Sequence, residues 1–248
     1  MRLNTCGPGA ADNVTKKNYL IDRKTKTISK YGLHRRTETI IQQFQQHDFS
    51  TPCVFLDIGT ADGLILQSLT EFHGPDESYS IGIDIKPRYV KSAKENTDHL
   101  LQADGRQLPL SDNSVDVIVS TAVFKHVREL KNLIKECHRV LRPDGKMIIT
   151  DPSPLGIYLG IFLGHFTRQE IVHVLGLDST QLILKECGFN VIYAGRFMLS
   201  PVPFWGSELL ERLLKRLRLD QLFFNQVICV EPRCSMDFKK ALSEFTQE

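Results

Sequence analysis

The chain has 248 residues, of which 42% are hydrophobic and 24% charged, and its formal net charge is +2. This is the composition of one ordinary soluble domain with a sizeable core. A charge so close to neutral gives no case for a general nucleic-acid binder. No run of residues approaches the roughly 18 apolar residues of a membrane span, and the N-terminus lacks an apolar signal core, so we expect a cytoplasmic protein.

The cysteines are spread along the chain without a C-x-x-C pair or any dense spacing. We therefore expect free thiols in a reducing compartment rather than disulfides or a zinc site, and no metal centre. The six positions are Cys6, Cys53, Cys137, Cys187, Cys229 and Cys234.

The first 50 residues are predicted to form an N-terminal arm and a helix. Residues 1–30 are polar and basic, which is typical of a solvated arm; an anion-binding or substrate-covering flap is the alternative. Apolar residues then recur at helical spacing over residues 31–49, which predicts an amphipathic helix packed on the core. The main domain is predicted over 51–234 and a tail over 235–248.

Residues 54–63 are the most informative stretch. An apolar run that contains Asp57 is followed by Gly59 and Gly63 and then by a helical pattern of leucines and isoleucines. This order predicts a buried strand, a tight turn and a helix. Glycines permit unusual dihedral angles and let a ligand approach the backbone, while the start of the helix offers unpaired N–H groups. The turn is therefore a candidate ligand cradle.

The next predicted strand, residues 80–84, ends in a carboxylate, and Pro87 stands where a helix would begin. Alternating strands and helices at this spacing predict a parallel sheet with helices on both faces. The ligand crevice should then lie at the carboxyl ends of the strands. Asp84 at such an end can accept both hydroxyls of a ribose; the alternative is that it caps the next helix.

Taken together, these motifs resemble motif I and the following acidic strand end of the class I S-adenosylmethionine (SAM)-dependent methyltransferases. Residues 108–120, LPLSDNSVDVIVS, resemble the loop and fourth strand of the type 11 subgroup. The family usually has a glycine where this chain has Ala61. An NAD-type oxidoreductase should show the third glycine of G-x-G-x-x-G, which is missing here. The resemblance covers roughly residues 54–231.

The resemblance implies an α/β, Rossmann-like, seven-stranded and mostly parallel sheet with helices on both faces and an antiparallel final strand. It implies SAM as cofactor and S-adenosylhomocysteine as product. Asp84 would accept from the ribose, Ile85 would cover the adenine, and Asp104 would accept from the adenine amino group, unless Asp104 is only a turn residue. The cofactor-binding residues predicted in this way are Asp57, Gly59, Thr60, Ala61, Gly63, Asp84, Ile85, Asp104, Gly105, Ser120 and Val123.

His126 is the candidate catalytic residue, because an imidazole titrates near neutral pH and this one follows the fourth strand. It could deprotonate an acceptor hydroxyl; the alternative is that it orders its loop. Residues 152–178 are expected to form a lid with Tyr158 and His165 as substrate-binding residues, or else a packed helical subdomain.

A second insertion, residues 200–224, contains a basic amphipathic helix near 207–219. Such a helix can contact a membrane surface or a partner, or simply cover the sheet edge or the pocket. The predicted function is methyl transfer from SAM to a small-molecule or lipid-like acceptor, with no nucleic acid. The alternatives are a non-catalytic SAM-binding or interaction protein, or an RNA or protein methyltransferase.

Overall fold

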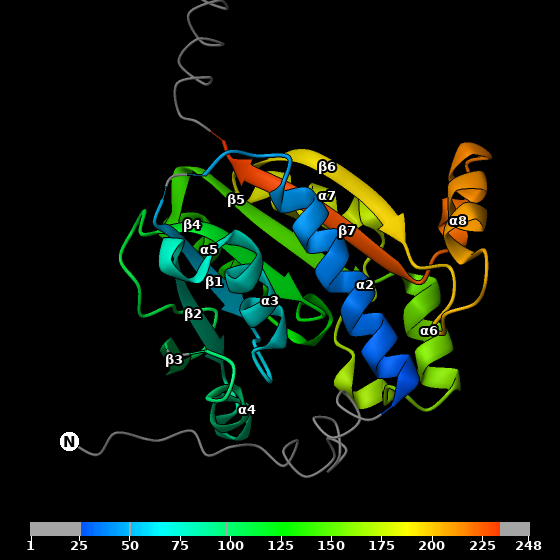
Figure 1. Ribbon diagram of the computed structural model, residues 1–248, viewed down its shortest axis with the longest axis horizontal. Coiled ribbons are helices and arrows are strands. Elements are labelled where there is room, and N and C mark those ends of the chain that lie inside the picture. Colours follow the sequence, from blue (N-terminus) through cyan, green and yellow to red (C-terminus); the bar gives the residue numbers. More distant parts are fainter. Residues whose placement is uncertain (1–25, 50, 98, 234–248) are drawn as a thin grey trace, which may run out of the picture.

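A computed structural model describes residues 26–49, 51–97 and 99–233. The predicted basic arm before residue 26 and the predicted tail over 235–248 lie outside these residues. A seven-stranded sheet forms the middle layer, with the strand order β3-β2-β1-β4-β5-β7-β6 (Figure 1). The predicted number of strands is therefore confirmed.

Six strands of this sheet run in the same direction, and β7 runs antiparallel to both of its neighbours, β5 and β6. Both the mostly parallel sheet and the antiparallel final strand are thus confirmed. The strands are Cys53–Ile58 (β1), Ser78–Asp84 (β2), His99–Gln102 (β3), Val115–Thr121 (β4), Leu141–Pro152 (β5), Phe189–Phe197 (β6) and Asn225–Pro232 (β7).

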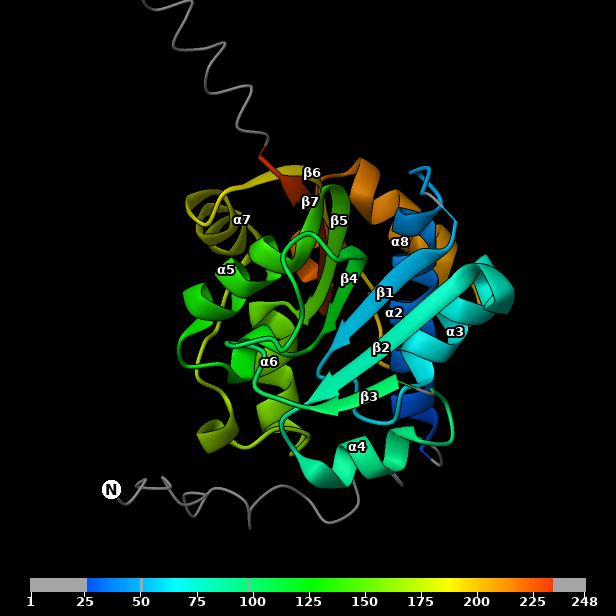
Figure 2. The ribbon, with the colours of Figure 1, turned by 90° about the vertical axis from the view of Figure 1, so that its left-hand side faces the viewer.

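Helices cover both faces of the sheet, with α2 and α3 on one side and α5 and α7 on the other (Figure 2). The α-helices are Thr27–Phe44 (α2), Leu64–His73 (α3), Pro87–Ala93 (α4), Leu130–Val140 (α5), Pro154–Phe162 (α6), Leu177–Glu186 (α7) and Ser207–Arg216 (α8). Short 3-10 turns are Pro75–Glu77, Phe124–His126, Arg168–Glu170 and Asp220–Leu222. Within the described residues, none of the helices combines the length and apolarity that a membrane crossing requires.

The core has two parts, one on each face of the sheet. Side chains of a strand alternate between faces, so β4 serves both parts: Ile118 packs in the cluster under α5 and α7, and Val117 and Val119 pack in the cluster under α2 and α3. This double burial explains why three successive residues in the middle of β4, Val117, Ile118 and Val119, are apolar. Cys53, Cys137, Cys187 and Cys229 are buried free thiols, whereas Cys6 and Cys234 lie outside the described residues.

Two predicted boundaries are corrected by the structure. The helix predicted over 31–49 runs over Thr27–Phe44, because the chain turns after Phe44 and stacks the Phe49 ring on the Phe44 ring at 4.7 Å. The apolar run over residues 147–151 predicts a strand from Met147, but β5 begins at Leu141, because Leu141 already pairs with Val115 before a register shift.

Candidate cofactor and acceptor site

The predicted site residues lie where parallel strands end together. β1, β2, β4 and β5 run in the same direction, so Ile58, Asp84, Thr121 and Pro152 mark one carboxyl edge of the sheet. In open α/β sheets this edge is where ligands bind.

The turn after β1 has an unusual backbone. Gly59, Ala61 and Gly63 have φ angles of 75°, 53° and 75°. This left-handed conformation is easy for glycine and strained for other residues, so Ala61 adopts the geometry of the glycine that the family has there. The turn is held against the end of β2, because the N–H groups of Gly59 and Thr60 donate to Ile83 O at 2.8 and 3.0 Å.

The glycine turn also packs on the loop after β4. A Cβ atom at Gly59 would lie 2.5 Å from Cγ2 of Val123, which is closer than real Cβ contacts. Gly59 is therefore needed for two reasons, its positive φ and its contact with Val123. These two predicted cofactor residues touch each other directly.

Asp84 is held rigidly at the end of β2. Its carboxylate accepts from the N–H of Lys86 at 2.9 Å and from the N–H of Ala61 at 3.3 Å. Burial raises the pKa of this carboxyl group, and the two backbone hydrogen bonds oppose that shift. The N-cap residue of helix α4, Lys86, makes no side-chain cap bond, and its own N–H is the one that Asp84 accepts, so the ribose role stays a prediction beside the capping alternative. The neighbouring Ile85 exposes 58% of its surface, which leaves an apolar side chain open beside the carboxylate.

Asp104 has a local partner in the structure. The guanidinium of Arg106 forms an ion pair with it at 2.7 Å, and this hydrogen-bonded contact lowers the pKa of the Asp104 carboxyl group. The N–H of Arg106 also donates to Asp104 Oδ1 at 3.0 Å, which is the geometry of a turn residue. The contact with adenine stays a prediction. A Cβ at the adjacent Gly105 would lie 3.1 Å from Leu133 Cδ1, so packing alone already favours a small residue there.

Two buried hydroxyl groups near the edge fit a polar ligand. Thr60 Oγ1, in the glycine turn, and Ser120 Oγ, near the end of β4, have no hydrogen-bond partner among the described residues. Ser120 pairs with Ile58 in the sheet, so both hydroxyls belong to the same edge. Buried polar groups are almost always satisfied, by protein, water or ligand. The residues present therefore fit a cofactor with ribose and amino-acid polar groups.

His126 ties the loop after β4 to the first insertion. Its Nδ1–H donates to Glu170 O at 2.6 Å. Desolvation, and secondarily the nearby Lys125 ammonium, lower the pKa of His126 to about 4, although part of the ring surface remains exposed. At neutral pH the ring is then uncharged and its free Nε2 is a weak base. This geometry favours the loop-ordering interpretation over general-base catalysis.

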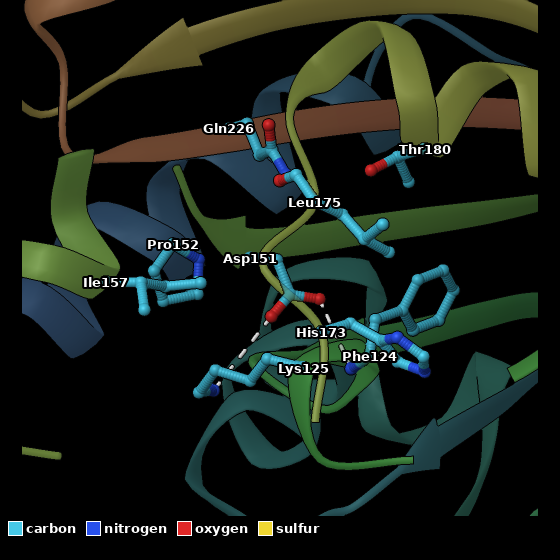
Figure 3. Close-up of a pocket in the computed structure, with 9 residues that line it drawn as sticks. All are labelled: Phe124, Lys125, Asp151, Pro152, Ile157, His173, Leu175, Thr180 and Gln226. Carbon is cyan, nitrogen blue, oxygen red and sulfur yellow. Dashed lines mark hydrogen bonds and ion pairs between the residues drawn. The ribbon is translucent and has the colours of Figure 1, made fainter. Parts of the chain in front are cut away.

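The sequence did not lead us to predict a buried ion pair that lies beside His126. Lys125 Nζ lies 3.9 Å from Asp151 Oδ1, with side chains that are 4% and 9% exposed (Figure 3). The lysine also donates to Ala122 O, and Asp151 Oδ2 accepts from the N–H of Phe124 at 3.3 Å. Burial lowers the pKa of Lys125 and raises that of Asp151. A lone lysine inside the apolar sequence AVFKHV was the only available signal.

The first insertion docks on the same loop. Lys125 O accepts from the N–H groups of Val172 and His173 at 2.7 and 3.2 Å. Beside these contacts lies a surface groove of about 510 Å³, which is lined by Tyr158, Ile161, Phe162, Arg168, Ile171 and Val174. Tyr158, which the sequence analysis predicts to bind substrate, thus lines a groove. His165 is exposed and is not among the lining residues.

The strand order, the antiparallel β7 and the glycine turn at the carboxyl edge define the fold of a class I methyltransferase. A solved SAM-dependent methyltransferase from Aquifex aeolicus has the same fold, with a TM-score of 0.55 and 19% identity over 79% of this chain and 89% of the other. Residues 56–149 match the model of the methyltransferase domain family. The chain therefore has the class I methyltransferase fold, and its residues 56–149 match the SAM-dependent methyltransferase domain that the sequence predicts; SAM is the cofactor that this family implies.

Curated relatives share this domain and differ in acceptor. A malonyl-[acyl-carrier protein] O-methyltransferase of Coxiella burnetii is 30% identical over 42% of this chain, and an arsenite methyltransferase of Halobacterium salinarum is 32% identical over 55%. The matches span 35% and 37% of those two relatives, little more than a third of their own length. The similarity thus covers about half of this chain, and the acceptors of these relatives are not carried over to it.

Proposed function

We propose that the protein transfers the methyl group of SAM to a small-molecule or lipid-like acceptor. The observation that carries this proposal is the glycine turn with left-handed φ angles at Gly59, Ala61 and Gly63, held against the buried carboxylate of Asp84. When bound, SAM supplies a methyl group that its sulfonium already activates. The protein then needs to hold donor and acceptor in line, and positioning can supply most of the rate.

The proposed roles follow from the contacts. Asp84 accepts from the ribose hydroxyls, and the hydroxyls of Thr60 and Ser120 gain the partners that they lack among the described residues. Val123 forms the apolar wall against which the turn rests. His126 holds the loop after β4 to the 168–170 turn and acts as a positioning residue. Asp57, Asp104 and Gly105 complete the proposed cofactor contacts on the same edge.

The acceptor is proposed to enter by the groove at Tyr158. Its lining is mostly aliphatic and aromatic, with the Arg168 guanidinium and the tyrosine hydroxyl as polar groups. Such a groove suits an acceptor with an apolar body and one polar or anionic group. The groove residues Arg168 and Ile171 flank Glu170, which binds His126, so the groove adjoins the loop after β4. Cytoplasmic residence stays a prediction.

Calorimetry with SAM, S-adenosylhomocysteine and NADH tests the cofactor, and NADH binding without SAM binding would refute it. Release of S-adenosylhomocysteine is then followed with fractionated metabolite and lipid extracts. Tyr158→Ala should lower release, whereas Tyr79→Ala, an exposed tyrosine on β2 that is 46% exposed, should not. SAM binding without release in any fraction would favour the non-catalytic SAM-binding alternative.

A further inference from the structure

Helix α8 is attached to the protein through Ser207 and Glu211, and its most exposed leucines lie on the opposite, outer side. Ser207 and Glu211 are buried, at 9% and 5% exposure, whereas Leu209, Leu213 and Leu217 are 69%, 50% and 58% exposed. A helix that only covers a sheet edge has the opposite orientation, with its apolar stripe against the core. The outward leucines of α8 therefore indicate that a partner binds on the outer side of this helix.

Specific contacts fix this orientation. Glu211 accepts from both terminal nitrogens of Arg35 in α2, at 3.2 and 2.8 Å, and from the N–H of Leu199 at 2.9 Å. Turning the leucines inward would break all of these contacts and leave the buried Glu211 carboxylate without them, which is costly; Arg35 would keep its contacts with Tyr31 and Glu38. The outward leucine face is thus a property of the folded protein.

More exposed apolar side chains flank α8. Trp205, immediately before the helix, is 99% exposed, and Phe204 is 42% exposed. Single exposed leucines are normal, but several large exposed apolar side chains within one short segment mark an interaction surface.

The charges around this face are predominantly positive. Exposed basic residues of the segment are Arg212, Lys215, Arg216 and Arg218. Of the acidic residues, Glu211 is buried, Asp220 is paired with Arg196 at 3.2 Å, and Glu208 lies exposed 4.0 Å from Arg212. Arg212 and Arg216 each follow an outward leucine by three positions, so they border the leucine stripe. Their long side chains can keep the charge at a polar boundary while the stems follow an apolar surface.

We propose that residues 202–222 dock on an anionic lipid surface, with Trp205 and the leucine stripe in the headgroup and acyl boundary and the basic residues against the lipid phosphates. An interfacial helix has this combination of a leucine and tryptophan face bordered by arginine and lysine. A second copy of the chain is the poorer occupant, because a symmetric interface would oppose the same positive side chains. The inference is independent of the proposed methyl transfer.

Vesicle co-sedimentation of the full-length protein tests the proposal, with phosphatidylcholine vesicles and with vesicles that contain one third phosphatidylserine. We expect binding to the anionic vesicles that weakens as salt rises. Arg212→Gln/Arg216→Gln should weaken it about thirtyfold, at about 1 kcal/mol per basic residue. The matched control, Lys135→Gln/Lys185→Gln, removes two exposed charges from α5 and α7 and should change binding less than twofold.

The apolar half of the surface is tested by Leu209→Asp/Leu213→Asp, which should abolish sedimentation while circular dichroism and SAM affinity stay unchanged. Leu182→Asp in α7, where the leucine is 59% exposed, is its control. Equal binding to neutral and anionic vesicles, or no loss in the leucine variant, would overturn the proposal. So would a concentration-dependent dimer that the leucine variant dissolves without any vesicle binding, because the face would then be a self-association surface.

Discussion

Replacing Asp84 tests the cofactor site most directly. The carboxylate is 7% exposed and each of its oxygens accepts one backbone N–H, which leaves lone pairs for the two hydroxyls of a ribose. A hydrogen bond to a charged group contributes about 1.5–3 kcal/mol. We expect Asp84→Ala to weaken SAM binding by about that amount, which is roughly 10- to 150-fold in Kd. Asp84→Asn keeps the shape of the side chain and one acceptor oxygen, so its affinity for SAM should lie between those of Asp84→Ala and the unchanged protein.

Titration calorimetry with SAM measures this difference. Asp76→Ala, an exposed aspartate just before β2, is the matched control and should leave the Kd unchanged. Because Asp84 also binds the Ala61 N–H, circular dichroism and thermal unfolding must accompany each titration. A native spectrum with an unchanged Kd in Asp84→Ala would refute the ribose assignment.

Three further predictions concern the turn, the groove and the buried pair. Gly59→Val should abolish measurable SAM binding in calorimetry, since the valine side chain would clash with Val123 and the backbone φ of 75° would be strained. Unchanged SAM affinity would show that the turn is not part of the cofactor site. Tyr158→Ala should lower turnover more than SAM affinity, and equal losses would argue against an acceptor groove. Lys125→Met should lower the free energy of unfolding by about 3 kcal/mol in urea titrations, because Asp151 loses its buried partner, and the further change Asp151→Leu should restore part of it. No recovery in the double variant would show that the lysine acts outside the pair.

The cofactor half of the fold could be predicted from local sequence. A strand, a glycine turn and a helix are encoded within residues 54–69, and Asp84 ends the next strand in the register that parallel pairing with β1 requires. Each of these features depends on neighbours in the chain. The left-handed φ at Ala61 is likewise a feature of this local turn.

The acceptor half depends on contacts between distant residues. Periodicity shows that α8 is amphipathic but does not say which side faces the protein, and the answer comes from Arg35, 176 positions away from Glu211. The pairing of Lys125 with Asp151 likewise joins a loop to a different strand end. For His126, the sequence supplied a titratable side chain, whereas the contact with Glu170 and the lowered pKa follow from tertiary packing.

The reversed direction of β7 has a consequence for how this protein can vary. Because β6 ends and β7 begins at the same edge, the connection over residues 198–224 does not have to cross the sheet. A parallel last strand would force that connection to return along one face as a crossover helix, and its sequence would then be bound to the core. Here only a few of its residues, such as Met198, Glu211 and Phe223, are buried against the rest of the protein. Mutations in it can remodel the outer surface while the seven strands and their register remain as they are.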